Sequence, residues 1–263
     1  MSPDLAADGN EKAGHFATTR WSLILRYGES SAEEGKASEA LAELCRIYWR
    51  PIFAYLWRST SSPEDAKDLT QEFFLRIMQG KFLQHADPGR GRFRSLLLRS
   101  LQNFLRDHHD RDKSQRRGGE MTFISWDQWM AEAPSQLSVP ASIVETWSPE
   151  RVFDVRWAAT VAERALRRLQ EECEGQGRRH VFDVLGGALT SERDQVSYER
   201  MGRELGADSA KIKRLLHKLR LRYRQLLREE VAETVEKSED INEELRYLVA
   251  SLAAGATDRV EPT

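Results

Sequence analysis

The sequence contains little cysteine and no long apolar run, and each of these shortages excludes a class of protein. Two cysteines, Cys45 and Cys173, among 263 residues cannot build a framework of several disulfides or a thiolate metal cluster. No stretch approaches the roughly 18 consecutive apolar residues of a membrane-spanning helix, and the polar first residues lack the apolar segment of a signal peptide. We therefore expect a cytoplasmic protein that does not insert into a membrane.

Segments with the two-residue period of a β-strand are also missing, and the prolines and glycines lie mostly between segments of helical period. Between residues 41 and 57 the apolar residues recur at steps of three and four, which predicts a helix. Pro51 lies inside this segment and predicts a kink or a break there. Ser62 and Ser148 each precede a proline, which is a common combination at a helix start. The pattern predicts an all-α protein with two helical domains.

The composition changes along the chain in a way that predicts five segments. The residues after Gly119 include scattered aromatic side chains but no sustained period, so we interpret this stretch as a linker. The predicted segments are a disordered tail (1–15), a first helical domain (16–118), a linker (119–147), a second helical domain with a helix-turn-helix (148–228) and a C-terminal extension with a short helix (229–263).

Positive charge is concentrated in two segments of a chain whose formal net charge is only −2. Residues 88–118 carry nine Lys or Arg against three Asp, and residues 197–228 carry ten against three acidic residues. These segments therefore carry net charges of +6 and +7, which leaves a net charge of −15 on the other 200 residues. Two basic segments in an acidic chain indicate two contacts with a polyanion such as a nucleic acid, although two solvated helix faces would give the same charge pattern.

Residues 198–228 have the layout of a helix-turn-helix, the motif that lays a helix in the DNA major groove. Gly206 can adopt the positive φ of a tight turn, and Asp208 stands where it can cap the second helix. Ile212 and Leu216 hold that helix by its apolar face, which leaves hydrogen-bond donors on the outward face. The residues predicted to contact duplex DNA are Ser209, Lys211, Lys213, Arg214, His217 and Lys218. An ordinary basic helical hairpin is the competing interpretation.

The sequence offers no candidate for catalysis, for a metal or for a cofactor. His108 and His109 are adjacent, so their side chains on a helix point about 100° apart and cannot readily share one ion. Gly89 and Gly91 belong to no dinucleotide-binding or phosphate-binding fingerprint, and no nucleophile motif is present. We therefore expect a protein that is not an enzyme.

Three segments of the chain together resemble a known family. Residues 65–77 (Asp-Ala-Lys-Asp-Leu-Thr-Gln-Glu-Phe-Phe-Leu-Arg-Ile) are similar to a polymerase-binding helix, and residues 93–117 to a promoter-melting segment. Residues 197–206, with the lysine-rich helix that follows, are similar to a promoter-reading helix-turn-helix. The family is the extracytoplasmic-function (ECF) group of bacterial RNA polymerase sigma factors. Residues 19–25, 68–74 and 243–246 are similar to a subgroup with an extended linker and a C-terminal tail.

The resemblance implies partners and roles for particular residues. It implies that core RNA polymerase binds an acidic and polar patch formed by Asp65, Asp68, Gln71 and Glu72. Without the resemblance, the same four residues would be interpreted as a solvated helix face. It implies that the following residues hold the melted strand of promoter DNA: Arg90, Arg92, Arg94, Asn103, Arg106, Arg111 and Lys113. An anti-sigma factor is a further candidate partner.

The predicted function is therefore promoter-specific transcription initiation. Bound to core polymerase, the second domain would read the upstream promoter element as duplex, and the first domain would melt and capture the downstream element. A helix-turn-helix regulator that acts on duplex DNA without polymerase is the competing class of function.

Overall fold

The computed structural model describes residues 34–60, 62–78, 92–112, 146–191, 196–235 and 237–257, with side chains from Ile47 onward except at 111–112 and 255–257. Within these ranges every regular element is helical, which confirms the predicted all-α class. The α-helices are α2 (Glu34–Ser59), α3 (Pro63–Met78), α4 (Phe93–Asp112), α7 (Pro149–Gly175), α8 (Arg179–Leu185), α9 (Tyr198–Leu205), α10 (Ser209–Ala232) and α11 (Ile241–Thr257). Two short 3-10 segments, η3 (Gly186–Ala188) and η5 (Ser238–Asp240), precede α9 and α11 respectively.

The helix starts follow the local capping chemistry of the sequence. The Ser62 hydroxyl accepts a hydrogen bond of 3.0 Å from the backbone N–H of Asp65 at the start of α3. The Ser148 hydroxyl does the same for the N–H of Arg151, at 3.3 Å, at the start of α7. α2 begins at Glu34 and continues through Pro51, so the predicted break does not occur there, and the alternative of a kink stays a prediction.

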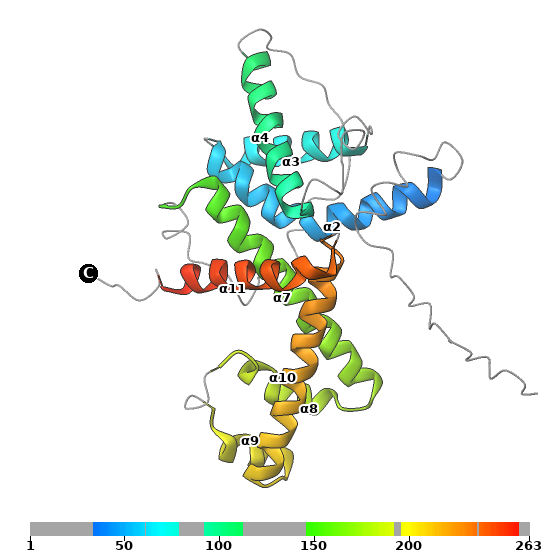
Figure 1. Ribbon diagram of the computed structural model, residues 1–263, viewed down its shortest axis with the longest axis vertical. Helices are drawn as coiled ribbons and strands as arrows, with labels where there is room; N and C mark the ends of the chain where they lie inside the picture. The colour runs from blue at the N-terminus through cyan, green and yellow to red at the C-terminus, as the bar shows by residue number, and fades with distance from the viewer. Residues whose placement is uncertain are drawn as a thin grey trace, which may run out of the picture.

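α2, α3 and α4 lie at one end of the molecule in Figure 1, and α7 and α10 run from them to α8 and α9 at the other end. The core at the first end is rich in aromatic rings. The Trp157 ring of α7 stacks on the Tyr48 ring of α2, with centroids 4.3 Å apart, and Phe93 of α4 packs against both. All three side chains are buried.

α7 and α10 each supply side chains to two hydrophobic cores. The first half of α7 places Trp157 in the aromatic core, while its second half places Leu169 in a core shared with α8, α9 and α10. α10 reverses this order, because Leu226 lies in the second core and Val231 in the first. The boundary expected after residue 228 therefore falls inside a continuous helix, and the division into domains stays a prediction.

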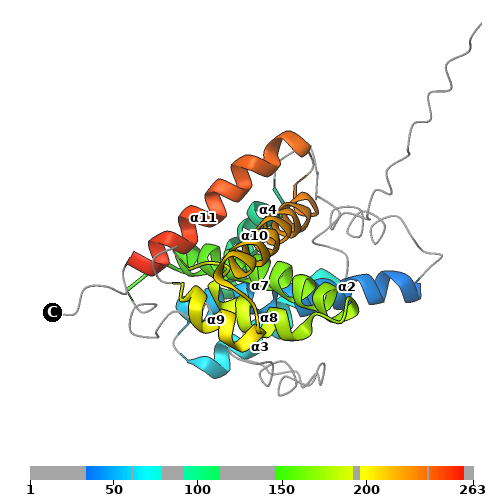
Figure 2. The same ribbon diagram turned by 90° about the horizontal axis from the view of Figure 1, so that it is seen from below.

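α11 closes the aromatic core from the side. Leu248 is buried, and Ile241, Leu245 and Leu252 pack against the same core while partly exposed. Seen from below in Figure 2, α11 extends along one flank of α7 and α10, on the side away from α3. The helix predicted for the C-terminal extension thus packs on α7 and α10 beside the aromatic core.

Candidate functional site

A tight turn at Gly206 joins α9 to α10 and presents the start of α10. Gly206 has φ +59°, the left-handed conformation that glycine adopts without steric cost. Asp208 then caps α10, since its carboxylate accepts a hydrogen bond of 2.6 Å from the N–H of Lys211. A Cβ atom on Gly202 would lie 2.5 Å from the carbonyl oxygen of Ala207, so α9 and the turn approach too closely for any other residue.

The apolar face of α10 anchors the helix, and its cationic face is open. Ile212, Leu216 and Leu219 are buried in the second core. Ser209 is partly exposed, and the other five residues predicted to contact duplex DNA are exposed: Lys211, Lys213, Arg214, His217 and Lys218. The six side chains therefore lie on the solvent side of one helix, in an arrangement that could meet a DNA groove.

α3 carries the four residues of the predicted polymerase patch on its outward side. Asp65 and Asp68 are exposed, while Gln71 and Glu72 are partly buried. The Glu72 carboxylate accepts a hydrogen bond of 2.9 Å from Arg76, one turn later, and lies 4.0 Å from Nε2 of His108. Glu72 is therefore held in place, whereas the two aspartates are exposed to solvent.

α4 presents a polar stripe that includes one residue the sequence interpretation did not select. Asn103 and Arg106, both predicted to hold melted DNA, are exposed. Arg99 is exposed one turn before Asn103, so Arg99, Asn103 and Arg106 share one face. Their i, i+4, i+7 spacing is the signal that could have found Arg99. Arg90, Lys113 and the side chain of Arg111 lie outside the described residues.

Arg92 and Arg94, also predicted to hold melted DNA, lie apart from this stripe. Arg94 is buried at the start of α4, where its guanidinium donates to Asp154 of α7 and, at 3.0 Å, to Glu244 of α11. Burial alone would lower the pKa of Arg94, but the charges of Asp154 and Glu244 outweigh it and raise the pKa. Arg92 is 2.7 Å from a carboxylate oxygen of Glu243 on α11. Both cations are thus engaged within the protein.

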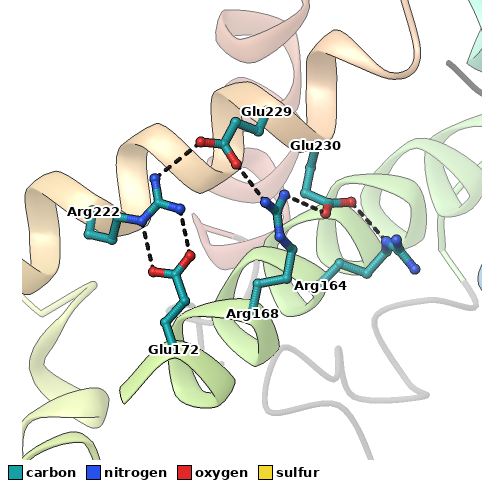
Figure 3. Close-up of polar contacts among 6 residues, drawn as sticks. All are labelled: Arg164, Arg168, Glu172, Arg222, Glu229 and Glu230. Atoms are coloured by element: carbon teal, nitrogen blue, oxygen red, sulfur yellow. Dashed lines mark hydrogen bonds and ion pairs between the residues drawn. The ribbon is translucent and has the colours of Figure 1, made fainter. Parts of the chain in front are cut away.

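An ionic network fixes α10 against α7, as Figure 3 shows. Arg222 makes a two-pronged contact with Glu172, with hydrogen bonds of 2.5 and 2.8 Å, and this lowers the pKa of the Glu172 carboxyl. Further along, Arg168 bridges Glu229 and Glu230. The members are Arg164, Arg168 and Glu172 of α7 with Arg222, Glu229 and Glu230 of α10.

A hydrogen bond from Tyr223 of α10 to α7 also joins these two helices. Its hydroxyl donates to the carbonyl of Ala162 at 3.1 Å, and burial raises its pKa to about 12, so it stays a donor at neutral pH. Since α7 also belongs to the aromatic core, the open face of α10 is held in a defined orientation to α2 and α4.

The described residues contain neither a membrane-spanning helix nor a metal-binding cluster. Over the described ranges no helix has the length and apolar character to cross a bilayer. No three His, Cys, Asp or Glu side chains in those ranges are grouped as metal ligands would be. What the geometry offers is an all-α scaffold with an acidic face on α3, a polar stripe on α4 and a cationic face on α10.

The family model of sigma-70 region 2 matches residues 44–115, which span the later part of α2 together with α3 and α4. The match makes this segment, about a quarter of the chain, similar to region 2 of sigma-70. It includes both the acidic patch of α3 and the polar stripe of α4. No curated protein and no solved structure matches this chain.

Proposed function

We propose that this protein is an ECF-type sigma factor with an extended linker and a C-terminal tail, which directs initiation at specific promoters from the cytoplasm. One observation carries the proposal: a chain matched to sigma-70 region 2 at residues 44–115 also presents an exposed cationic helix face directly after a tight glycine turn. Region 2 alone would account for polymerase and melted DNA. The face of α10 supplies a second DNA contact, on duplex.

In this proposal the two DNA surfaces do different work. The start of α10 enters the major groove of the upstream promoter element, where Lys, Arg and Ser donate to base edges and phosphates. The stripe of Arg99, Asn103 and Arg106 on α4 holds the melted downstream strand, since cations track the phosphates and a side-chain amide can bond an unpaired base. Arg90, Arg111 and Lys113 stay predictions for the same strand.

The patch on α3 is proposed to bind core polymerase, and its removal tests this. Replacing both Gln71 and Glu72 with alanine should weaken binding to core polymerase at least about fivefold, or roughly 1 kcal/mol. Their partly exposed side chains contribute little to the fold, so helicity and melting temperature should change little. Binding is measured by fluorescence anisotropy of labelled protein titrated with core polymerase.

Gln170→Ala with Glu171→Ala, an adjacent Gln-Glu pair on the surface of α7, is the matched control and should bind normally. Normal binding by the double variant would reject the patch as the polymerase surface. A large loss of melting temperature would instead assign the two residues to the fold.

On the cationic face of α10, we expect some residues to contact base edges and others to contact phosphates. Arg214→Ala should relax the preference at one or two positions of the upstream element, because a bidentate arginine contact to a base is worth about 1–3 kcal/mol of discrimination. Lys218→Ala, one turn later, should weaken all sequences alike and lower the salt slope by about one. Selection of bound sequences from randomised upstream elements measures both effects.

Arg224→Ala, exposed further along α10, serves as the control for loss of a remote cation. If Arg214→Ala weakens every sequence by the same factor, base reading belongs to another residue.

Runoff transcription with core polymerase and purified protein decides between the two classes of function. A sigma factor makes core polymerase start at defined sites, and sequencing of the transcripts identifies them. A regulator that binds duplex DNA without polymerase would bind promoter DNA yet give no specific starts with core enzyme alone. An anti-sigma partner would reduce the starts when added.

A further inference from the structure

The C-terminal helix α11 covers the two arginines at the start of α4. Glu244, whose side chain is fully buried, accepts a hydrogen bond of 3.0 Å from Nε of Arg94 and lies 3.2 Å from Nη1 of Arg92. Glu243 contacts Arg92 at 2.7 Å, and the Tyr247 ring lies 4.0 Å from the guanidinium carbon of Arg94. Two carboxylates and one aromatic ring of α11 therefore contact these two cations, and Asp154 of α7 also accepts a hydrogen bond from Arg94.

These three groups of α11 supply the chemistry that a nucleotide strand would supply. A guanidinium binds carboxylate and phosphate oxygens with the same donor fork, so Glu243 and Glu244 stand where phosphates would bind. A guanidinium also stacks on an aromatic face, which either a tyrosine or a base provides. The match of both features at Arg92 and Arg94 is more specific than a general attraction of opposite charges.

The attachment of α11 is suited to exchange. Its contact with the cations is electrostatic, and the Glu243 side chain is 69% exposed, so an added polyanion can compete for Arg92. Of its apolar anchors, Leu248 is buried, whereas Ile241, Leu245 and Leu252 are only partly covered. Val235 is buried in the aromatic core ahead of α11, so the chain stays attached there if α11 moves away.

We propose that α11 is an intramolecular competitor of single-stranded DNA, which holds Arg92 and Arg94 until a melted strand displaces it. This rests on the proposed function, together with the sequence-based prediction that Arg92 and Arg94 also contact the melted strand. In the competitor arrangement the free protein binds single strands weakly, and the strand opened at a promoter, delivered at high local concentration, releases α11. A purely structural brace would hold the same contacts and would not respond to DNA.

The test uses full-length variants and a fluorescein-labelled single-stranded oligonucleotide of 20 random nucleotides. Glu243→Gln with Tyr247→Ala removes one charge and one ring, both partly or largely exposed, and leaves buried Glu244 in place. The matched control, Glu239→Gln with Val249→Ala, removes one charge and one exposed apolar side chain of the same extension. Among the described residues, Glu239 forms no ion pair with a cation.

We expect the first double variant to bind the oligonucleotide about fivefold more tightly, with a salt slope steeper by about 0.7 for each phosphate gained. The control should match the wild type within twofold. Adding Arg92→Ala to the first double variant should abolish the gain. Hydrogen exchange tests the displacement of α11 in the wild-type protein, because the α11 amides should exchange faster once the oligonucleotide is bound.

Other outcomes separate the competitor from the proposed function. If the first variant shows no gain but Arg92→Ala weakens wild-type binding, α11 is not a competitor and Arg92 keeps its proposed role. If Arg92→Ala has no effect in either background, the assignment of Arg92 to the melted strand fails as well, while initiation in runoff transcription tests the sigma function separately. An equal gain in the control, or unchanged exchange of α11 with bound oligonucleotide, would overturn the competitor.

Discussion

Replacing Trp157 with alanine is expected to lower the free energy of unfolding by about 3–5 kcal/mol, the cost of removing a large aromatic side chain from a packed core. Trp157 is fully buried, and its ring stacks on Tyr48 with an interplanar angle of 7°. Phe93 and Phe153 lie 5.9 and 5.8 Å from it, centroid to centroid. These ring contacts stabilise the fold in addition to the effect of removing apolar surface from water.

The position of Trp157 makes this loss more than local. It belongs to α7 and joins that helix to α2 and α4, so the cavity would open where α7 meets the sigma region 2 segment. Urea unfolding followed by far-UV circular dichroism measures the change. Trp57→Ala is the matched control, since Trp57 is 44% exposed and its loss should cost about 1 kcal/mol or less. A similar cost for both variants would contradict the packing role of Trp157.

Local chemistry explains why the helices could be predicted from the sequence. The caps at Ser62, Ser148 and Asp208 involve residues within three positions of each other, so the printed order of residues contains the whole interaction. The turn at Gly206 is local in the same sense. The exposed face of α10 followed directly, because helical periodicity determines which side chains are opposite the apolar ones.

Contacts between distant segments could not be predicted in this way. Arg94 and Glu244 are 150 positions apart, and no periodicity of either segment indicates that they meet. The sequence showed a basic segment around Arg92 and Arg94 and an acidic C-terminal extension, but opposite charges alone do not select a pairing. The packing of α7 into both cores could not be predicted from the sequence for the same reason. Its apolar stripe indicates a buried face without naming the helices that bury it.

The network between α7 and α10 presents the same difficulty and leads to a second large expected effect. Glu230 is 1% exposed and accepts hydrogen bonds from Arg164 at 2.8 Å and from Arg168 at 3.1 Å. Replacing it with alanine leaves both guanidinium groups without this carboxylate. A hydrogen bond to a charged group is typically worth about 1.5–3 kcal/mol, and Arg164 and Arg168, which are 23% and 35% exposed, are partly hydrated once the carboxylate is gone, so the expected loss is about 3 kcal/mol. We expect Glu230→Ala to destabilise the protein by that amount in urea unfolding.

Glu229→Ala is the matched control for this change. Glu229 precedes Glu230 and also contacts Arg168 and Arg222, but its side chain is 37% exposed, so solvent screens its contacts and the expected cost is about 1 kcal/mol or less. A third variant with methionine at Arg164, Arg168 and Glu230 removes the buried carboxylate together with its two partly exposed partners. It should recover much of the loss, since apolar replacement of a whole ionic group is often neutral.

The same variants separate stability from orientation on DNA. If the network serves only the fold, the methionine variant regains both stability and binding to the upstream duplex. If the network fixes the angle of α10 to α7, that variant regains stability but not full DNA binding. On a template with both the upstream duplex and the melted element, it binds the two less cooperatively, because the two protein surfaces are no longer held in one orientation. Equal costs for Glu230→Ala and Glu229→Ala would instead show that the burial of Glu230 does not determine its contribution.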